Sequence, residues 1–109
     1  MAKGAEAKIK SESMLRNAWT KIMELADQYN DPGEFTAFIG YEWTASVGGG
    51  DNLHRNVVFK SDRVPARPLS WIESPSVHDL WDFLHSECVD GIAGCDAITI
   101  PHNSNLSTG

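Results

Sequence analysis

The sequence lacks the features that mark several large classes of protein. It has 9 Lys and Arg against 15 Asp and Glu, which gives a formal net charge of -6 over 109 residues. The basic residues form no stripe, so the sequence predicts no nucleic-acid partner. No apolar run approaches the roughly 18 residues of a membrane span, and MAKGAEAKIK has no apolar signal-peptide core. We therefore expect no membrane partner, and the cellular compartment stays open.

Cysteine is also scarce. The chain has two, Cys88 and Cys95, and their spacing is not that of a CxxC motif. No second cysteine pair completes a zinc site. The favoured interpretation is two unpaired small residues near a helix end, and the alternative is a local disulfide in an oxidising compartment. The glycine-rich stretch at 46–50 does not match a phosphate-binding Walker loop and is better interpreted as a hairpin tip.

What is present is typical of one small globular domain, with 41% hydrophobic and 22% charged residues. The sequence predicts an α/β fold in the order helix, β-hairpin, helix, strand. The expected elements are a helix capped by Ser13 and ending at Tyr29, strands at Phe35–Trp43 and Leu53–Phe59, a helix capped by Ser76, and a strand at Asp96–Ile100. Residues 1–12 are expected to form a flexible N-terminal segment, and the alternative is that residues 1–10 are part of a longer helix.

The two central strands carry the first candidate ligands. With the hairpin turn centred near Gly48, Glu42 lies directly opposite His54, and directly opposed side chains have Cβ atoms about 4.5–5.5 Å apart. A carboxylate oxygen and an imidazole nitrogen at that separation can share a metal ion. Arg55 and Asn56 follow His54, and both are candidates for orienting the ligands or contacting the substrate. Arg55 is interpreted either as a contact for an anionic substrate or as an ion-pair partner of Glu42 or Asp51.

A third candidate ligand, His102, directly follows the last strand. Loops just beyond strand ends collect functional groups in α/β folds. Asn103 and Asn105 supply donors and acceptors that could orient the ligands. The spacing alone also fits a structural role, because a histidine at a strand end more often packs through hydrogen bonds than binds a metal.

Four segments of the chain, taken together, resemble a bacterial family called domain of unknown function 3604. The segments are GEFTAFIGYEWT, GDNLHRNVVF, HDLWDFL and AITIPHNSNLSTG, and the resemblance covers roughly residues 13–109. The family belongs to the PHP (polymerase and histidinol phosphatase) superfamily of metal-dependent hydrolases. The resemblance implies a distorted β/α barrel with two or three metal ions. It implies that Glu42, His54 and His102 are metal ligands, with Glu42 able to bridge two ions.

The sequence departs from the family pattern in several places. The opening GDLHxHT-like strand, the later TDH-like strand and a final Asp/His segment are absent. We therefore expect residues 13–109 to be a partial PHP-like domain, truncated at both ends, that cannot complete a metal cluster by itself. Residues 13–109 then form an incomplete barrel, and the isolated chain is expected to bind divalent metal weakly and to have little or no activity.

The resemblance implies metal-assisted hydrolysis by the intact protein. Zinc, manganese or iron would activate a water molecule toward a small-molecule phosphoester, carboxyl ester or carbamate. No catalytic residue is predicted beyond the metal ligands, and the oligomeric state is open. The alternative function is a non-catalytic structural fragment or binding module, in which Glu42, His54 and His102 only stabilise the fold.

Overall fold

The computed structural model describes residues 2–48, 51–70 and 76–101. The chain divides into two compact units, Met1–Ala37 and Phe38–Gly109, which we describe separately. No helix within the described ranges is both long enough and apolar enough to pass through a membrane.

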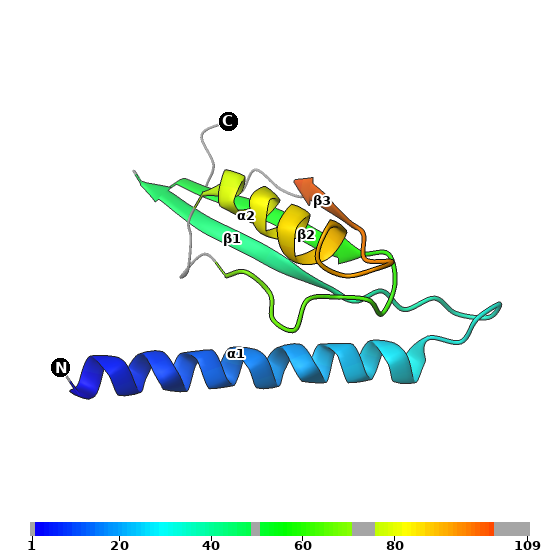
Figure 1. Ribbon diagram of the computed structural model, residues 1–109, viewed down its shortest axis with the longest axis horizontal. Coiled ribbons are helices and arrows are strands. Elements are labelled where there is room, and N and C mark those ends of the chain that lie inside the picture. The colour runs from blue at the N-terminus through cyan, green and yellow to red at the C-terminus, as the bar shows by residue number, and fades with distance from the viewer. Residues whose placement is uncertain (1, 49–50, 71–75, 102–109) are drawn as a thin grey trace. The chain divides into compact units, whose positions relative to one another are not determined.

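The first unit is a single helix followed by a tight turn. Helix α1 spans Ala2–Tyr29 (Figure 1). The prediction that Ser13 caps this helix is wrong, because the Ala-, Lys- and Glu-rich residues before it are good helix formers and continue the helix toward the N-terminus. After the helix, Asp31 and Phe35 form an isolated β-bridge around Gly33, whose φ of +91° favours glycine.

The second unit is built on a three-stranded antiparallel sheet in the order β1-β2-β3. The strands are β1, Gly40–Gly48, β2, Asp51–Phe59, and β3, Ala97–Pro101. Strand β1 begins later than predicted because Phe35 belongs to the preceding turn. Gly40 is required at the start of β1, since a Cβ there would lie 2.7 Å from the carbonyl oxygen of Val57.

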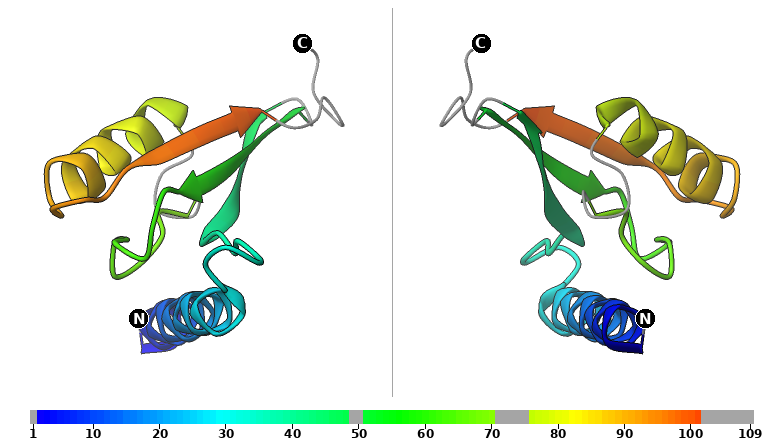
Figure 2. Two further views of the ribbon diagram at one scale, coloured as in Figure 1. Left: turned by 90° about the vertical axis from the view of Figure 1, so that its right-hand side faces the viewer. Right: turned by 90° about the vertical axis from the view of Figure 1, so that its left-hand side faces the viewer.

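A short helical segment lies beside β3 in this unit (Figures 1 and 2). Helix α2, Val77–Phe83, continues directly into the π-helical turn η1, Leu84–Val89. The predicted cap is confirmed, because the Ser76 hydroxyl accepts a hydrogen bond from the backbone N–H of His78. Leu80 and Leu84 are buried, as their helical spacing predicts.

The core of the second unit lies on one face of the sheet. Alternate residues of β1 and β2 place Trp43, Ala45, Val57 and Phe59 on this face, and all four are buried. The same face carries Arg55, whose guanidinium lies 5.7 Å from the centre of the Trp81 ring of α2. The helix therefore covers this face, which we call the helix-covered face.

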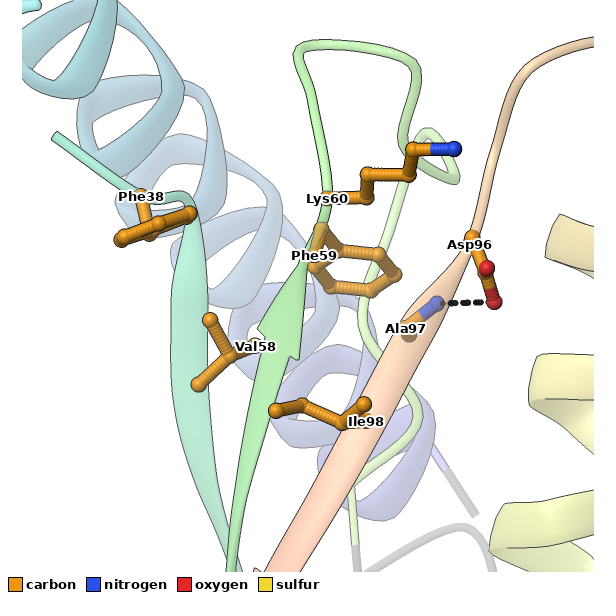
Figure 3. A pocket seen from close by; sticks show the side chains of 7 residues that line it. All are labelled: Phe38, Val58, Phe59, Lys60, Asp96, Ala97 and Ile98. Carbon is orange, nitrogen blue, oxygen red and sulfur yellow. Dashed lines mark hydrogen bonds between the residues drawn. The ribbon is translucent and has the colours of Figure 1, made fainter. Parts of the chain in front are cut away.

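The opposite face of the sheet, which we call the open face, is partly apolar and partly polar. Val58, Ile98 and Ile100 share it, and both isoleucines are exposed. A pocket of about 260 Å³ lies at one end of this face (Figure 3). Its lining residues are Phe38, Val58, Phe59, Lys60, Asp96, Ala97 and Ile98. The fold is thus mixed α/β, as predicted, and the described residues form no barrel.

The two cysteines are paired. Cys88 in η1 and Cys95 before β3 form a disulfide with 5.1 Å between their Cα atoms. The favoured prediction of unpaired cysteines is therefore wrong, and the alternative of a local disulfide is correct. The reason lies in tertiary structure: the turn at 90–94 brings the end of η1 back to the start of β3, which a spacing of seven residues does not by itself reveal.

We expect loss of this disulfide to lower the free energy of unfolding by roughly 2.5 kcal/mol, because the cross-link closes a loop of about eight residues in the unfolded chain. Urea unfolding of a Cys88→Ala/Cys95→Ala variant measures the loss. A reducing agent should destabilise the original chain by a similar amount and leave the double variant unchanged. Equal stability of the two oxidised proteins would contradict this prediction.

Candidate functional site

The β1–β2 hairpin brings Glu42 and His54 together on the open face. The observed register pairs Thr44 with His54 and Glu42 with Asn56. The predicted register, with Glu42 directly opposite His54, is therefore wrong. The error arises because the hairpin is centred one residue later along the chain than predicted, which moves each partner by two residues. The observed register differs from the predicted one by two residues. Side chains two residues apart point to the same face of a strand, so Glu42 and His54 still share a face.

Three polar side-chain atoms meet at this place. The Thr44 hydroxyl donates to Glu42 Oε1 at 2.8 Å. His54 Nδ1 lies 2.9 Å from the same Oε1 and 3.1 Å from Thr44 Oγ1. We call Glu42, Thr44 and His54 the hairpin triad. All three residues are held by neighbouring positions of two paired strands, so their mutual geometry follows from the sheet.

The hairpin triad is accessible from solvent. The side chain of Glu42 is 47% exposed, and that of His54 is 15% exposed. The His54 side chain is thus largely enclosed by its neighbours, whereas the Glu42 carboxylate is about half open to solvent. A carboxylate and an imidazole in this setting can bind a divalent metal ion, or can move a proton between a substrate and the protein.

The structure separates the two residues that follow His54. Asn56 lies directly opposite Glu42 on the open face and is half-buried, so it is beside the hairpin triad. Arg55 lies on the helix-covered face against Trp81. Glu42, one of its two predicted ion-pair partners, lies on the other face, because successive strand residues point to opposite faces. The side chain of Asp51, the other predicted partner, is outside the described set.

The remaining predicted site residues are His102, Asn103 and Asn105, and these lie outside the described residues. The described part of β3 ends at Pro101, which pairs with Arg55. Across the three described ranges, no group of three or more His, Cys, Asp or Glu side chains is arranged to hold a metal ion. Glu42 and His54 therefore supply two donors of suitable chemistry, and the described residues do not complete a first shell.

Two other histidines do not join the hairpin triad. His78 packs edge-on against Trp81 with 5.2 Å between ring centres. His85 lies 3.0 Å from the Asp90 carboxylate at the end of η1 and is 71% exposed. The pocket at the end of the open face is also separate, since neither Glu42 nor His54 lines it.

Thr44 is the residue of the hairpin triad that sequence reasoning missed. The signal was present in GYEWT, where Glu42 and Thr44 are two positions apart. In a strand, residues at that spacing share a face. A hydroxyl beside a carboxylate on the same face is a ready hydrogen-bond partner, and the alternation alone could have added Thr44 to the candidate site.

Comparison with known proteins gives one finding about the sequence. A family model described as "Protein of unknown function (DUF3604)" matches residues 1–109. The match includes the first twelve residues, which the motif resemblance did not cover. Searches of curated proteins and of solved structures returned no match.

Proposed function

Since the chain belongs to the family described as "Protein of unknown function (DUF3604)", we propose that it forms part of a metal-dependent hydrolase. The observation that carries this proposal is the contact between Glu42 Oε1 and His54 Nδ1, 2.9 Å apart on an accessible strand face. Hard carboxylate oxygen and imidazole nitrogen are the donor types that zinc, manganese and iron accept together.

The proposed metal ligands are Glu42, His54 and His102. The first two fit the role by chemistry and by mutual distance. His102 is the residue after Pro101, the end of a strand that runs beside β2. Further ligands would have to come from residues outside the described set, as expected for a two- or three-metal cluster of the PHP superfamily.

The two faces of the sheet support the proposed partial barrel. In β/α barrels the helices cover the outer face of the sheet, and the inner face carries packed side chains with functional groups at one end. Here α2 lies against Arg55 on one face. The open face carries the hairpin triad toward the hairpin tip and Val58, Ile98 and Ile100 away from it. The antiparallel pairing of all three strands differs from the parallel strands of a regular β/α barrel, so the pairing itself does not support the barrel.

The proposed reaction is hydrolysis of a small phosphoester, carboxyl ester or carbamate. A bound divalent metal would supply a Lewis acid and a water molecule of lowered pKa. In this scheme Glu42 and His54 hold the site in place from two paired strands, Thr44 fixes the carboxylate, and Asn56 offers an amide beside it.

Metal analysis and a substrate panel test this proposal. We expect the intact protein, of which this chain forms part, to retain zinc, manganese or iron, and to hydrolyse at least one of a phosphoester, a carboxyl ester and a carbamate. A chelator should remove the activity, and the metal should restore it. Full activity in metal-free protein would contradict the proposal. Absence of both metal and hydrolysis would favour the structural alternative, in which the hairpin triad only joins β1 to β2.

A further inference from the structure

We infer that this protein folds and works in an oxidising compartment, outside the reducing cytosol. The inference starts from the disulfide between Cys88 and Cys95, which pairs both cysteines of the chain. Composition and charge left the compartment open. The inference is independent of the proposed metal site and of the proposed hydrolysis.

The two sulfurs of this disulfide are enclosed by the fold. Cys88 is fully buried, and Cys95 is only 6% exposed. Cysteines that exchange disulfides or sense oxidants are accessible to solvent, because another thiolate or an oxidant has to reach the sulfur. The separation of seven positions also differs from the CxxC pattern of thiol oxidoreductases. The bond is therefore structural, and it takes no part in a redox reaction of the folded protein.

A structural disulfide carries information about cellular location. Such bonds form and persist in the bacterial periplasm, in the secretory pathway and outside cells. In the cytosol, glutathione and thioredoxin keep thiols reduced, and most disulfides found there are transient bonds in catalysis or redox sensing. The Cys88–Cys95 bond, with both sulfurs out of reach of other thiols, belongs to the structural group.

The segment between the two cysteines is shaped by local contacts. The backbone N–H of Ile92 donates to the carbonyl oxygen of Cys88 at 3.0 Å, and that of Cys95 donates to the carbonyl oxygen of Ile92 at 3.0 Å. Gly94, just before Cys95, has a φ of +83°, which favours glycine. Two successive turns thus bring the Cα atoms of the cysteines to 5.1 Å, a normal distance for a disulfide. The pairing needs no distant part of the chain, so it can occur early in folding.

Burial of the sulfurs determines when the bond forms. In the folded protein an oxidant cannot reach them, so the oxidant has to be present where the chain folds. We assign this role to an oxidoreductase with an accessible disulfide. One cysteine thiolate attacks that disulfide and forms a mixed disulfide, and the second thiolate then attacks the first cysteine and releases the oxidoreductase as a dithiol. Two electrons and two protons pass from the cysteine pair to the oxidoreductase.

Differential alkylation of the intact protein in its own cells tests the inference. Cells are quenched in acid, and the unfolded proteins are labelled with one alkylating reagent, reduced, and labelled with an isotopically heavier one. We expect peptide mass spectrometry to find only the second label on Cys88 and Cys95, and cell fractionation to find the protein outside the cytosol. The first label on these cysteines would overturn the inference. Paired cysteines in a protein located in the cytosol, as occur in hyperthermophiles, would overturn it as well.

The purified chain tests the step from burial to the time of oxidation. After folding in reductant, the chain should form the disulfide several-fold faster with oxidised glutathione in urea than in native buffer, because unfolding exposes the sulfurs. Cys88→Ala is the matched control, since it leaves Cys95 as a single thiol and separates access from loop closure. Its alkylation should be slowed by folding in the same way. Equal rates in urea and buffer, for either protein, would show that the sulfurs are accessible after folding and would remove the basis of the inference.

Discussion

Replacing His54 by alanine in the intact protein, of which this chain forms part, is expected to lower ester hydrolysis about a hundredfold or more. In the proposed site, His54 supplies a metal-binding nitrogen, and it contacts both Glu42 and Thr44. Removal of residues that only orient a metal ligand lowers metal affinity or activity about 10- to 100-fold. Loss of the ligand itself should therefore lower them by about 100-fold or more. The bound metal, measured by elemental analysis, should fall together with the rate.

The fold should survive this change. The side chain of His54 lies on the open face and is not part of the packed core, which is on the helix-covered face. Its hydrogen bonds are partly exposed, so their loss should cost no more than about 1 kcal/mol of unfolding free energy. Urea unfolding of the variant beside the original chain measures this.

His85→Ala is the control for a histidine outside the hairpin triad. His85 is highly exposed and pairs with Asp90 at the end of η1. Exposed ion pairs contribute little, so this variant should keep both its metal and its rate. A His54→Ala protein with the original rate would rule out the proposed metal site. Equal losses of bound metal and of rate in the His54→Ala and His85→Ala variants would indicate a general effect of removing a histidine.

Phe59→Ala is expected to destabilise the second unit by about 3–5 kcal/mol, the usual cost of removing a buried phenylalanine ring. Phe59 is the last residue of β2 and is only 1% exposed. Its ring stacks with that of Tyr41 with 6.5 Å between the ring centres. Truncation would leave a cavity in the core that the rigid sheet cannot fill.

Phe38→Ala provides a control with the same change in chemistry. Phe38 lies just before β1 and lines the pocket on the open face, where Figure 3 shows both phenylalanines. It is 61% exposed, so its removal should change stability by only about 0.5 kcal/mol. Urea unfolding of the two variants side by side decides the matter. Similar losses of unfolding free energy in the Phe59→Ala and Phe38→Ala variants would contradict the placement of the core on the helix-covered face.

Local sequence patterns predicted the order and type of the elements correctly. The apolar β-branched residues of β2, the Ser76 cap and the glycines of the hairpin act over a few residues, and such signals can be identified in the sequence alone. The placement of Glu42 and His54 on one face also followed from the sequence, because strand alternation has a period of two. The element ends were less certain: α1 begins earlier than predicted, and β1 begins later.

Tertiary structure decided what depends on contacts between separate segments. The centre of the hairpin, one residue later than predicted, placed Thr44, not Glu42, opposite His54. The turn after η1 brought Cys88 to Cys95. The packing of α2 against the sheet brought the Trp81 ring to within 5.7 Å of the Arg55 guanidinium. Composition and periodicity describe each segment by itself, whereas register, pairing and burial depend on how the segments pack against one another.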